Sequence, residues 1–296
     1  MKRGGERLVR LRKHKKTELL VSAFIDPIAQ FGRMGVIQAV FEGSFNVKVK
    51  DQIIHFASYK GYVAGHGIYV PRETYSLMRP YLAKGNRMRI TENQLTIYSQ
   101  PNTLTIDYEA KVISQKIDSI QADQAIIKQV TAAYDQATRQ GLRIGLDNQD
   151  EDFKKVQTIL IDGLFNKENV EFITHYLVGR GRGLTPSGDD MLVGYLSVIW
   201  HFAGDKAQML ADTLKKDTLS TTDVSKAYLL AAANGHFSTP LYKFYQAVNR
   251  FNTGQAENLA DIIESIEWIM KIGHTSGQDM TYGMGMAFQY LNNQAR

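Results

Sequence analysis

The chain has 296 residues and a formal net charge of +5, and 44% of its residues are hydrophobic and 22% charged. This length and composition suit a globular protein with one large domain or two smaller ones. The chain contains no cysteine, which excludes disulfide frameworks, cysteine nucleophiles and cysteine-ligated metal sites. No stretch reaches the roughly 18 apolar residues of a membrane span, and the basic N-terminus lacks a signal-peptide cleavage pattern. We therefore expect a cytoplasmic protein with no membrane partner.

The positive charge is concentrated in residues 1–16, which hold eight basic side chains and one acidic side chain. The rest of the chain is therefore slightly acidic. A block of like charges is typical of a solvated tail, so we assign residues 1–19 to a basic N-terminal arm. Leu8, Val9 and Leu11 leave room for this arm to dock on the protein. Nucleic acid is not an expected partner, because no aromatic residue is interleaved with the basic ones.

Residues 20–117 have the pattern of a β-rich domain. Val47 and Val49 alternate with lysines, and another strand-like run, 52–57, follows after a short connection. This spacing predicts a hairpin. Glycines and prolines punctuate the segment, as they do in a small barrel or sandwich.

The pattern changes to helical at about residue 118. Ile120, Ile127, Val130 and Tyr134 recur at helical spacing with polar residues between them. Further helical patterns cover 151–163, 167–178, 188–203, 205–217, 221–234, 239–251, 255–271 and 277–291. The connections are short, and glycine or proline marks many of them. Residues 118–296 are therefore expected to form a compact all-helical domain, which makes the whole chain an α+β protein.

The densest signal for function is Gly-Arg-Gly-Arg-Gly-Leu-Thr-Pro-Ser-Gly-Asp-Asp at 179–190. Alternate glycines let the backbone approach a ligand closely, and Ser187 with Asp190 fits a capping box. The next ten residues are apolar on most faces, so the helix start is expected inside a site or an interface. A glycine-rich approach to a helix start is a natural anion site. Arg180 and Arg182 would add charge-assisted hydrogen bonds to a phosphate or carboxylate.

The adjacent acids Asp189 and Asp190 complicate an anion site. One can serve the helix cap, while the other could hold a hard cation such as magnesium or position a substrate N–H group. The segment is not a Walker motif, and the chain has neither a Gly-x-Ser-x-Gly elbow nor a His-Glu-x-x-His zinc motif. The residues expected to bind the anion in this segment are Arg180, Arg182, Gly183, Thr185, Ser187, Gly188 and Asp189.

A second segment repeats the first helix start. Ser187-Gly-Asp-Asp-Met-x-x-Gly194 aligns with Ser276-Gly-Gln-Asp-Met-x-x-Gly283. We predict that the two helices pack together and bring both starts to one pocket, which adds Ser276 and Gly277 to the residues that bind the anion. The alternative is a duplicated helical hairpin without any catalysis.

His274 precedes the second helix start by two residues. The positive end of the helix dipole would favour its neutral imidazole, which makes it a candidate base. The alternative is a surface or capping histidine.

Three blocks of the sequence resemble one known family. They are Gly-Leu-Thr-Pro-Ser-Gly-Asp-Asp-Met-Leu-Val-Gly at 183–194, the segment 221–242, and Gly-His-Thr-Ser-Gly-Gln-Asp at 273–279. On these blocks the chain resembles the AllH subunit family of bacterial oxamate carbamoyltransferase. The resemblance is strongest over about 175–290 and weak over the β-rich part.

The resemblance implies a role in the breakdown of allantoin or related purine nitrogen. It also implies partner subunits and the interconversion of oxalurate and phosphate with oxamate and carbamoyl phosphate. We therefore expect a carbamoyltransferase subunit that binds a small anionic metabolite at the first helix start, with Asp190, Asp279 and His274 as catalytic residues. The alternative is a non-catalytic metabolite-binding or scaffold subunit.

Overall fold

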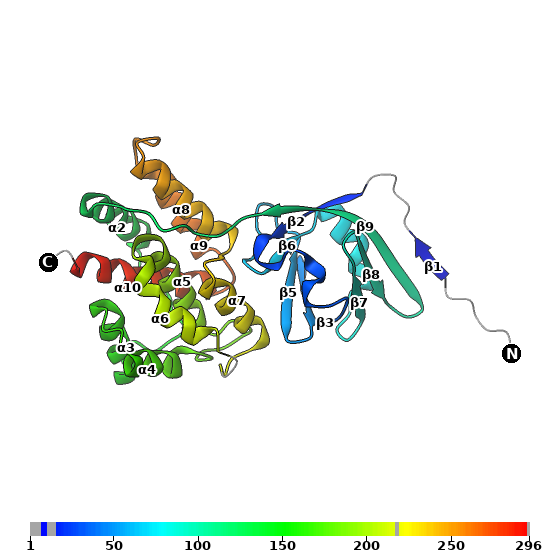
Figure 1. Ribbon diagram of the computed structural model, residues 1–296, viewed down its shortest axis with the longest axis horizontal. Helices are drawn as coiled ribbons and strands as arrows, with labels where there is room; N and C mark the ends of the chain where they lie inside the picture. Colours follow the sequence, from blue (N-terminus) through cyan, green and yellow to red (C-terminus); the bar gives the residue numbers. More distant parts are fainter. Residues whose placement is uncertain (1–6, 11–15, 217–218, 295–296) are drawn as a thin grey trace. The chain divides into compact units, whose positions relative to one another are not determined.

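A computed structural model describes residues 7–10, 16–216 and 219–294, and it divides the chain into two compact units between Gln115 and Lys116. The first unit is a β-barrel and the second is made of helices (Figure 1). The predicted α+β fold class is thereby confirmed. No helix in the described ranges is long and apolar enough to cross a membrane.

The first unit is an eight-stranded closed barrel. Around the barrel the strands follow the order β9-β2-β6-β5-β4-β3-β7-β8, and a further pairing of β8 with β9 closes the ring. β9 can close it because it is long: its residues 103–107 pair with β8 on one edge, and 108–113 pair with β2 on the other. The strands are β1 (Arg7–Arg10), β2 (Thr17–Ser22), β3 (Met34–Val40), β4 (Ser44–Val49), β5 (Gln52–Ala57), β6 (Gly67–Tyr69), β7 (Arg87–Ile90), β8 (Gln94–Tyr98) and β9 (Asn102–Ile113).

The predicted hairpin is confirmed as the antiparallel pair β4–β5. Phe45 and Phe56 face each other across this pair, and their rings stack with centroids 4.6 Å apart. Both side chains are fully buried in the barrel core.

A short helix, α1 (Arg72–Met78), begins directly after Pro71, where the sequence pattern indicated only a break between strands. The 3-10 turns are η1 (Ala23–Ile25), η2 (Ile28–Phe31) and η3 (Arg79–Tyr81).

Part of the expected basic arm belongs to the β-sheet. β1 runs parallel to residues 102–105 of β9, and β2 already begins at Thr17. Residues 1–6 and 11–15 of the expected arm lie outside the described residues.

The second unit is built around α5, which is buried on nearly every face from Ser187 to Ile199. Local capping sets several of the surrounding helices: the Asp150 and Asn166 side chains accept hydrogen bonds from the first turns of α3 and α4. The helices are α2 (Gln124–Thr138), α3 (Glu151–Asp162), α4 (Lys167–Leu177), α5 (Ser187–Phe202), α6 (Gly204–Leu214), α7 (Asp223–Ala233), α8 (Thr239–Asn252), α9 (Ala260–Met270) and α10 (Ser276–Asn293).

Helices α5 and α10 cross with their main chains in contact. A Cβ atom added at Gly194 would lie 1.9 Å from the carbonyl oxygen of Met280. In the same way, a Cβ added at Gly283 would lie 2.0 Å from the carbonyl oxygen of Met191. These residues occupy equivalent positions in the two repeated segments, so the crossing is reciprocal. The predicted packing of the two helices is confirmed.

Candidate functional site

The reciprocal crossing brings the two repeated helix starts together. The Thr185 and Ser276 hydroxyl oxygens lie 2.9 Å apart, although the residues are 91 positions apart in the chain. Each motif glycine also packs against the end of the preceding helix. A Cβ at Gly188 would lie 2.1 Å from the carbonyl oxygen of Leu177, and a Cβ at Gly277 would lie 2.0 Å from that of Ile269.

The predicted capping box at Ser187 is wrong. Ser187 is the first residue of α5, Pro186 is its N-cap, and no side chain caps this helix. Pro186 already holds the extended backbone conformation that precedes a helix. The serine is therefore placed one residue inside the helix, where its side chain is buried under the loops that carry Gly145 and Gly181.

Several backbone N–H groups at the two helix starts already donate hydrogen bonds within the chain. The Gly188 N–H donates to the carbonyl oxygen of Arg180, at 2.9 Å, and the Asp190 N–H donates to that of Pro186. In the second motif, the Gly277 N–H donates to Ile272. Gly188 and Gly277, both expected to bind an anion, thus have an internal acceptor. Arg180 and the loop 181–184, which contains Gly183, form the part of the first motif that is open to solvent.

The two arginines of the first motif are exposed: Arg182 lies on this loop and Arg180 directly precedes it. The Arg180 guanidinium stacks over the Tyr176 ring, 3.8 Å from its centroid, and its Nε donates to the Tyr176 carbonyl oxygen at 2.8 Å. These contacts hold the Arg180 guanidinium against Tyr176, at the start of the loop and not over the buried carboxylates. Arg182 is also solvent-exposed, so any anion that it binds would bind at the surface.

Asp189 is fully engaged with neighbouring donors. Its Oδ1 accepts from the Gly179 N–H at 2.9 Å, and its Oδ2 accepts from the hydroxyls of Thr221 and Ser225. Burial raises the pKa of Asp189, while these three hydrogen bonds oppose the rise. Asp189 therefore fastens the glycine loop and the start of α7 to α5.

Asp190 and Asp279 are the buried acids that the two starts share. Asp190 is 4% exposed and Asp279 0% exposed. Burial raises the pKa of both carboxyls, that of Asp190 strongly, and the Asp279 charge raises the pKa of Asp190 further. The hydroxyls that oppose these shifts come mainly from the other motif, Ser276 beside Asp190 and Ser187 beside Asp279. Each aspartate thus lies beside the serine of the opposite motif.

A loop that the sequence analysis did not single out covers this pair. The Gly145 N–H donates to Asp279 Oδ1 at 2.9 Å, and the Arg143 N–H donates to Gln278 Oε1 at 2.6 Å. A Cβ at Gly145 would lie 2.0 Å from Ser187 Oγ. Gly145 marks a break between helical patterns, but nothing local in the sequence indicates that this loop returns to a helix start more than 130 residues away.

His274 lies in the exposed turn before α10. It is on the surface beside the helix start, and not among the buried acids. Within 7–10, 16–216 and 219–294, no three acidic, histidine or cysteine side chains gather into a metal cluster.

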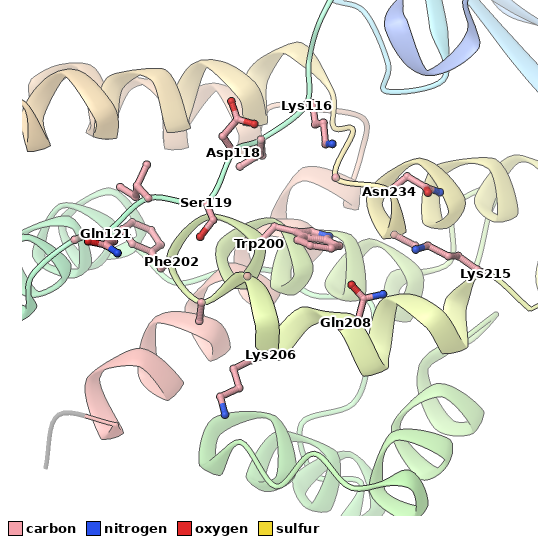
Figure 2. A pocket seen from close by; sticks show the side chains of 17 residues that line it. Lys116, Asp118, Ser119, Gln121, Trp200, Phe202, Lys206, Gln208, Lys215 and Asn234 are labelled. Atoms are coloured by element: carbon pink, nitrogen blue, oxygen red, sulfur yellow. The ribbon is translucent and has the colours of Figure 1, made fainter.

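A large cavity of about 1050 Å³ lies in the same unit, at the opposite end of α5 (Figure 2). Its lining includes Trp200 and three lysines, Lys116, Lys206 and Lys215. The Trp200 indole N–H donates to the Ala232 carbonyl oxygen at 2.9 Å, which fixes the ring at the cavity wall. None of the residues predicted for the site lines this cavity.

The family described as oxamate carbamoyltransferase subunit AllH matches residues 177–288. This stretch contains both repeated helix starts and the crossing between them. The resemblance to the AllH family is confirmed. No solved structure matches the chain.

Proposed function

We propose that this chain is a subunit of an oxamate carbamoyltransferase-like complex and that it binds a small anionic substrate where α5 and α10 begin. One observation carries the proposal: the stretch similar to AllH joins two matching helix starts around shared buried carboxylates. The ligand would be carbamoyl phosphate, oxamate or oxalurate. The role in allantoin nitrogen breakdown and the partner subunits are part of the same proposal.

In this arrangement the anionic group binds to the loop 181–184 with Arg180 and Arg182, because charge-assisted hydrogen bonds favour phosphate and carboxylate groups. Asp190 and Asp279 orient the reacting group or hold a magnesium ion. In the direction that forms carbamoyl phosphate, a phosphate oxygen attacks the carbamoyl carbon of oxalurate and the bond from that carbon to the oxamate nitrogen breaks. His274 supplies the proton that the departing nitrogen takes up.

The test is a reconstituted complex assayed with the wild-type chain, Asp190→Asn and His274→Ala. Each substitution should lower turnover by about 100-fold or more, the scale of a lost positioning or proton-transfer group. Full activity in both variants would contradict the assigned roles. A chain with Ser197→Ala, which removes a buried hydroxyl further along α5, is the control for general effects on packing.

A binding or scaffold subunit without catalysis is the second candidate. Its support is the reciprocal glycine crossing, which is by itself a device for docking two helices. This candidate predicts that the complex needs the chain for assembly and that neither Asp190→Asn nor His274→Ala changes turnover.

A further inference from the structure

The centre of the site is acidic although the proposed ligand is an anion. Asp190 and Asp279 each keep one carboxylate oxygen, Oδ2, that is buried and accepts no hydrogen bond. None of the ion pairs among the described residues involves either aspartate. A buried acceptor without a donor costs about 1–3 kcal/mol, and more when it is charged. Two such oxygens at one place therefore indicate a partner that the free protein lacks.

Hydroxyl groups lie beside both carboxyls, from Ser276 and Thr185 at Asp190 and from Ser187 and Thr275 at Asp279. None of them makes a hydrogen bond to either Oδ2. Thr185 and Ser276 lie within hydrogen-bond distance of each other. Asp279 receives the Gly145 N–H on Oδ1, and Oδ2 lies 3.7 Å from the position of a Gly145 Cβ. Asp279 Oδ2 therefore lies beneath the 145 loop, near the place that the Ser187 hydroxyl occupies because residue 145 has no side chain.

The missing partner cannot be an anion. A phosphate or carboxylate group next to these oxygens would be repelled, because like charges at short range in a buried site interact strongly. An amide or ureido –NH2 group presents two N–H donors and no charge. Carboxylate oxygens are strong acceptors for such donors.

We propose that Asp190 and Asp279 form the subsite for the –NH2 end of the substrate, and that its anionic end lies toward loop 181–184. This inference rests on the proposed function and deepens it: the ligand must carry an amide or ureido group as well as a negative charge. The two aspartates then determine specificity, because they reject an anion of the same shape that lacks N–H donors.

The test compares two anions of nearly equal size and charge, oxamate and pyruvate, in which a methyl group replaces the –NH2 group. Dissociation constants are measured for the full-length chain by calorimetry. The wild type should bind oxamate about 10-fold or more tightly than pyruvate, because pyruvate leaves the buried oxygens without donors. Asp190→Asn and Asp279→Asn should reduce this preference to about 3-fold or less. Ser197→Ala should keep the wild-type preference.

The outcomes separate this inference from the proposed function. Equal binding of oxamate and pyruvate by the wild type would overturn the –NH2 subsite and leave the anion site standing. Binding of neither anion would overturn the small-anion site, and the subsite with it. Thermal stabilisation by magnesium alone that Asp190→Asn abolishes would also overturn the subsite, because a cation would then be the missing partner.

Discussion

The starts of α5 and α10 agree at the serine, glycine, aspartate, methionine and later glycine, but they differ at the third position. Asp189 occupies this position in α5, and Gln278 occupies it in α10. Asp189 accepts from Gly179, Thr221 and Ser225, whereas Gln278 accepts from the Arg143 N–H. The shared positions build the crossing and the pair of buried acids. The residue at the third position accepts hydrogen bonds from the segments that lie beside its own helix.

This difference explains why two neighbouring aspartates in the first motif have different surroundings. Asp189 has three donors and no counterpart acid in the second motif. Asp190 has an unpartnered oxygen and a counterpart in Asp279. Comparison of the two motifs therefore distinguishes the residues that build the shared pair of acids from those that only hold a neighbouring loop. A single motif would not show this difference.

Substitution of the two shared glycines at the helix crossing should have the largest effect on stability. Gly194→Ala or Gly283→Ala places a methyl group about 2 Å from a carbonyl oxygen of the opposite helix, so the helices must move apart. We expect each change to lower the free energy of unfolding by about 3 kcal/mol, measured by urea denaturation. Gly204→Ala is the control, because its Cβ would meet only Ser119 at 3.4 Å. Unchanged stability in both crossing variants would contradict the close contact.

Substitutions at the third position of the motif should have an intermediate effect on stability, and the effect should differ between the two motifs. Asp189→Ala leaves two hydroxyls and an N–H group without their acceptor and should cost about 2–3 kcal/mol of stability. Gln278→Ala removes one hydrogen bond at a half-buried position and should cost about 1 kcal/mol or less. Thermal and urea unfolding of the two variants measure the difference. Equal losses of stability in the two variants would contradict the different roles of Asp189 and Gln278.

The buried pair gives an effect of another kind, a dependence of stability on pH. Burial raises the pKa of both carboxyls above their unfolded-chain value of 3.8, so the folded state binds their protons more tightly. Their stabilising contribution is complete below the unfolded-chain pKa and is lost as the pH rises through the raised values. The free energy of unfolding should fall by at most about 1.4 kcal/mol per pH unit for each proton released.

Urea denaturation at several pH values between about 4 and 7 measures this slope. Asp190→Asn and Asp279→Asn should each flatten it, since an amide does not titrate. A slope that neither variant changes would show that both carboxylates are already ionised at the lower pH.

The architecture was predictable where one element carries its own periodic pattern. The alternation in β4 and β5 and the helical spacing in the second unit predicted the hairpin and the helices to within a few residues. Closure of the barrel was not predictable, because it depends on both edges of β9 pairing with strands distant in sequence. The short helix α1 was also missed, since Pro71 was interpreted as a break between strands and not as a helix N-cap.

The arrangement of the candidate site was predictable to the extent that its motif repeats. Alignment of the two motifs was enough to predict the packing of α5 against α10. It did not predict that each aspartate lies beside the serine of the other motif, or that the Gly145 loop covers them. Those contacts depend on how the helices cross, and the capping rule that was applied to Ser187 considers only neighbours along the chain.

The distance in sequence between the two helix starts also affects how the protein is made. Thr185 and Ser276 are 91 residues apart, which at ribosomal rates is a delay of roughly 5–20 seconds. Throughout that interval α5, apolar on nearly all sides, has emerged without the helix that covers it. The nascent chain therefore exposes the apolar surface of α5 until the second motif is synthesised, and exposed apolar surface of this kind is what chaperones protect during translation.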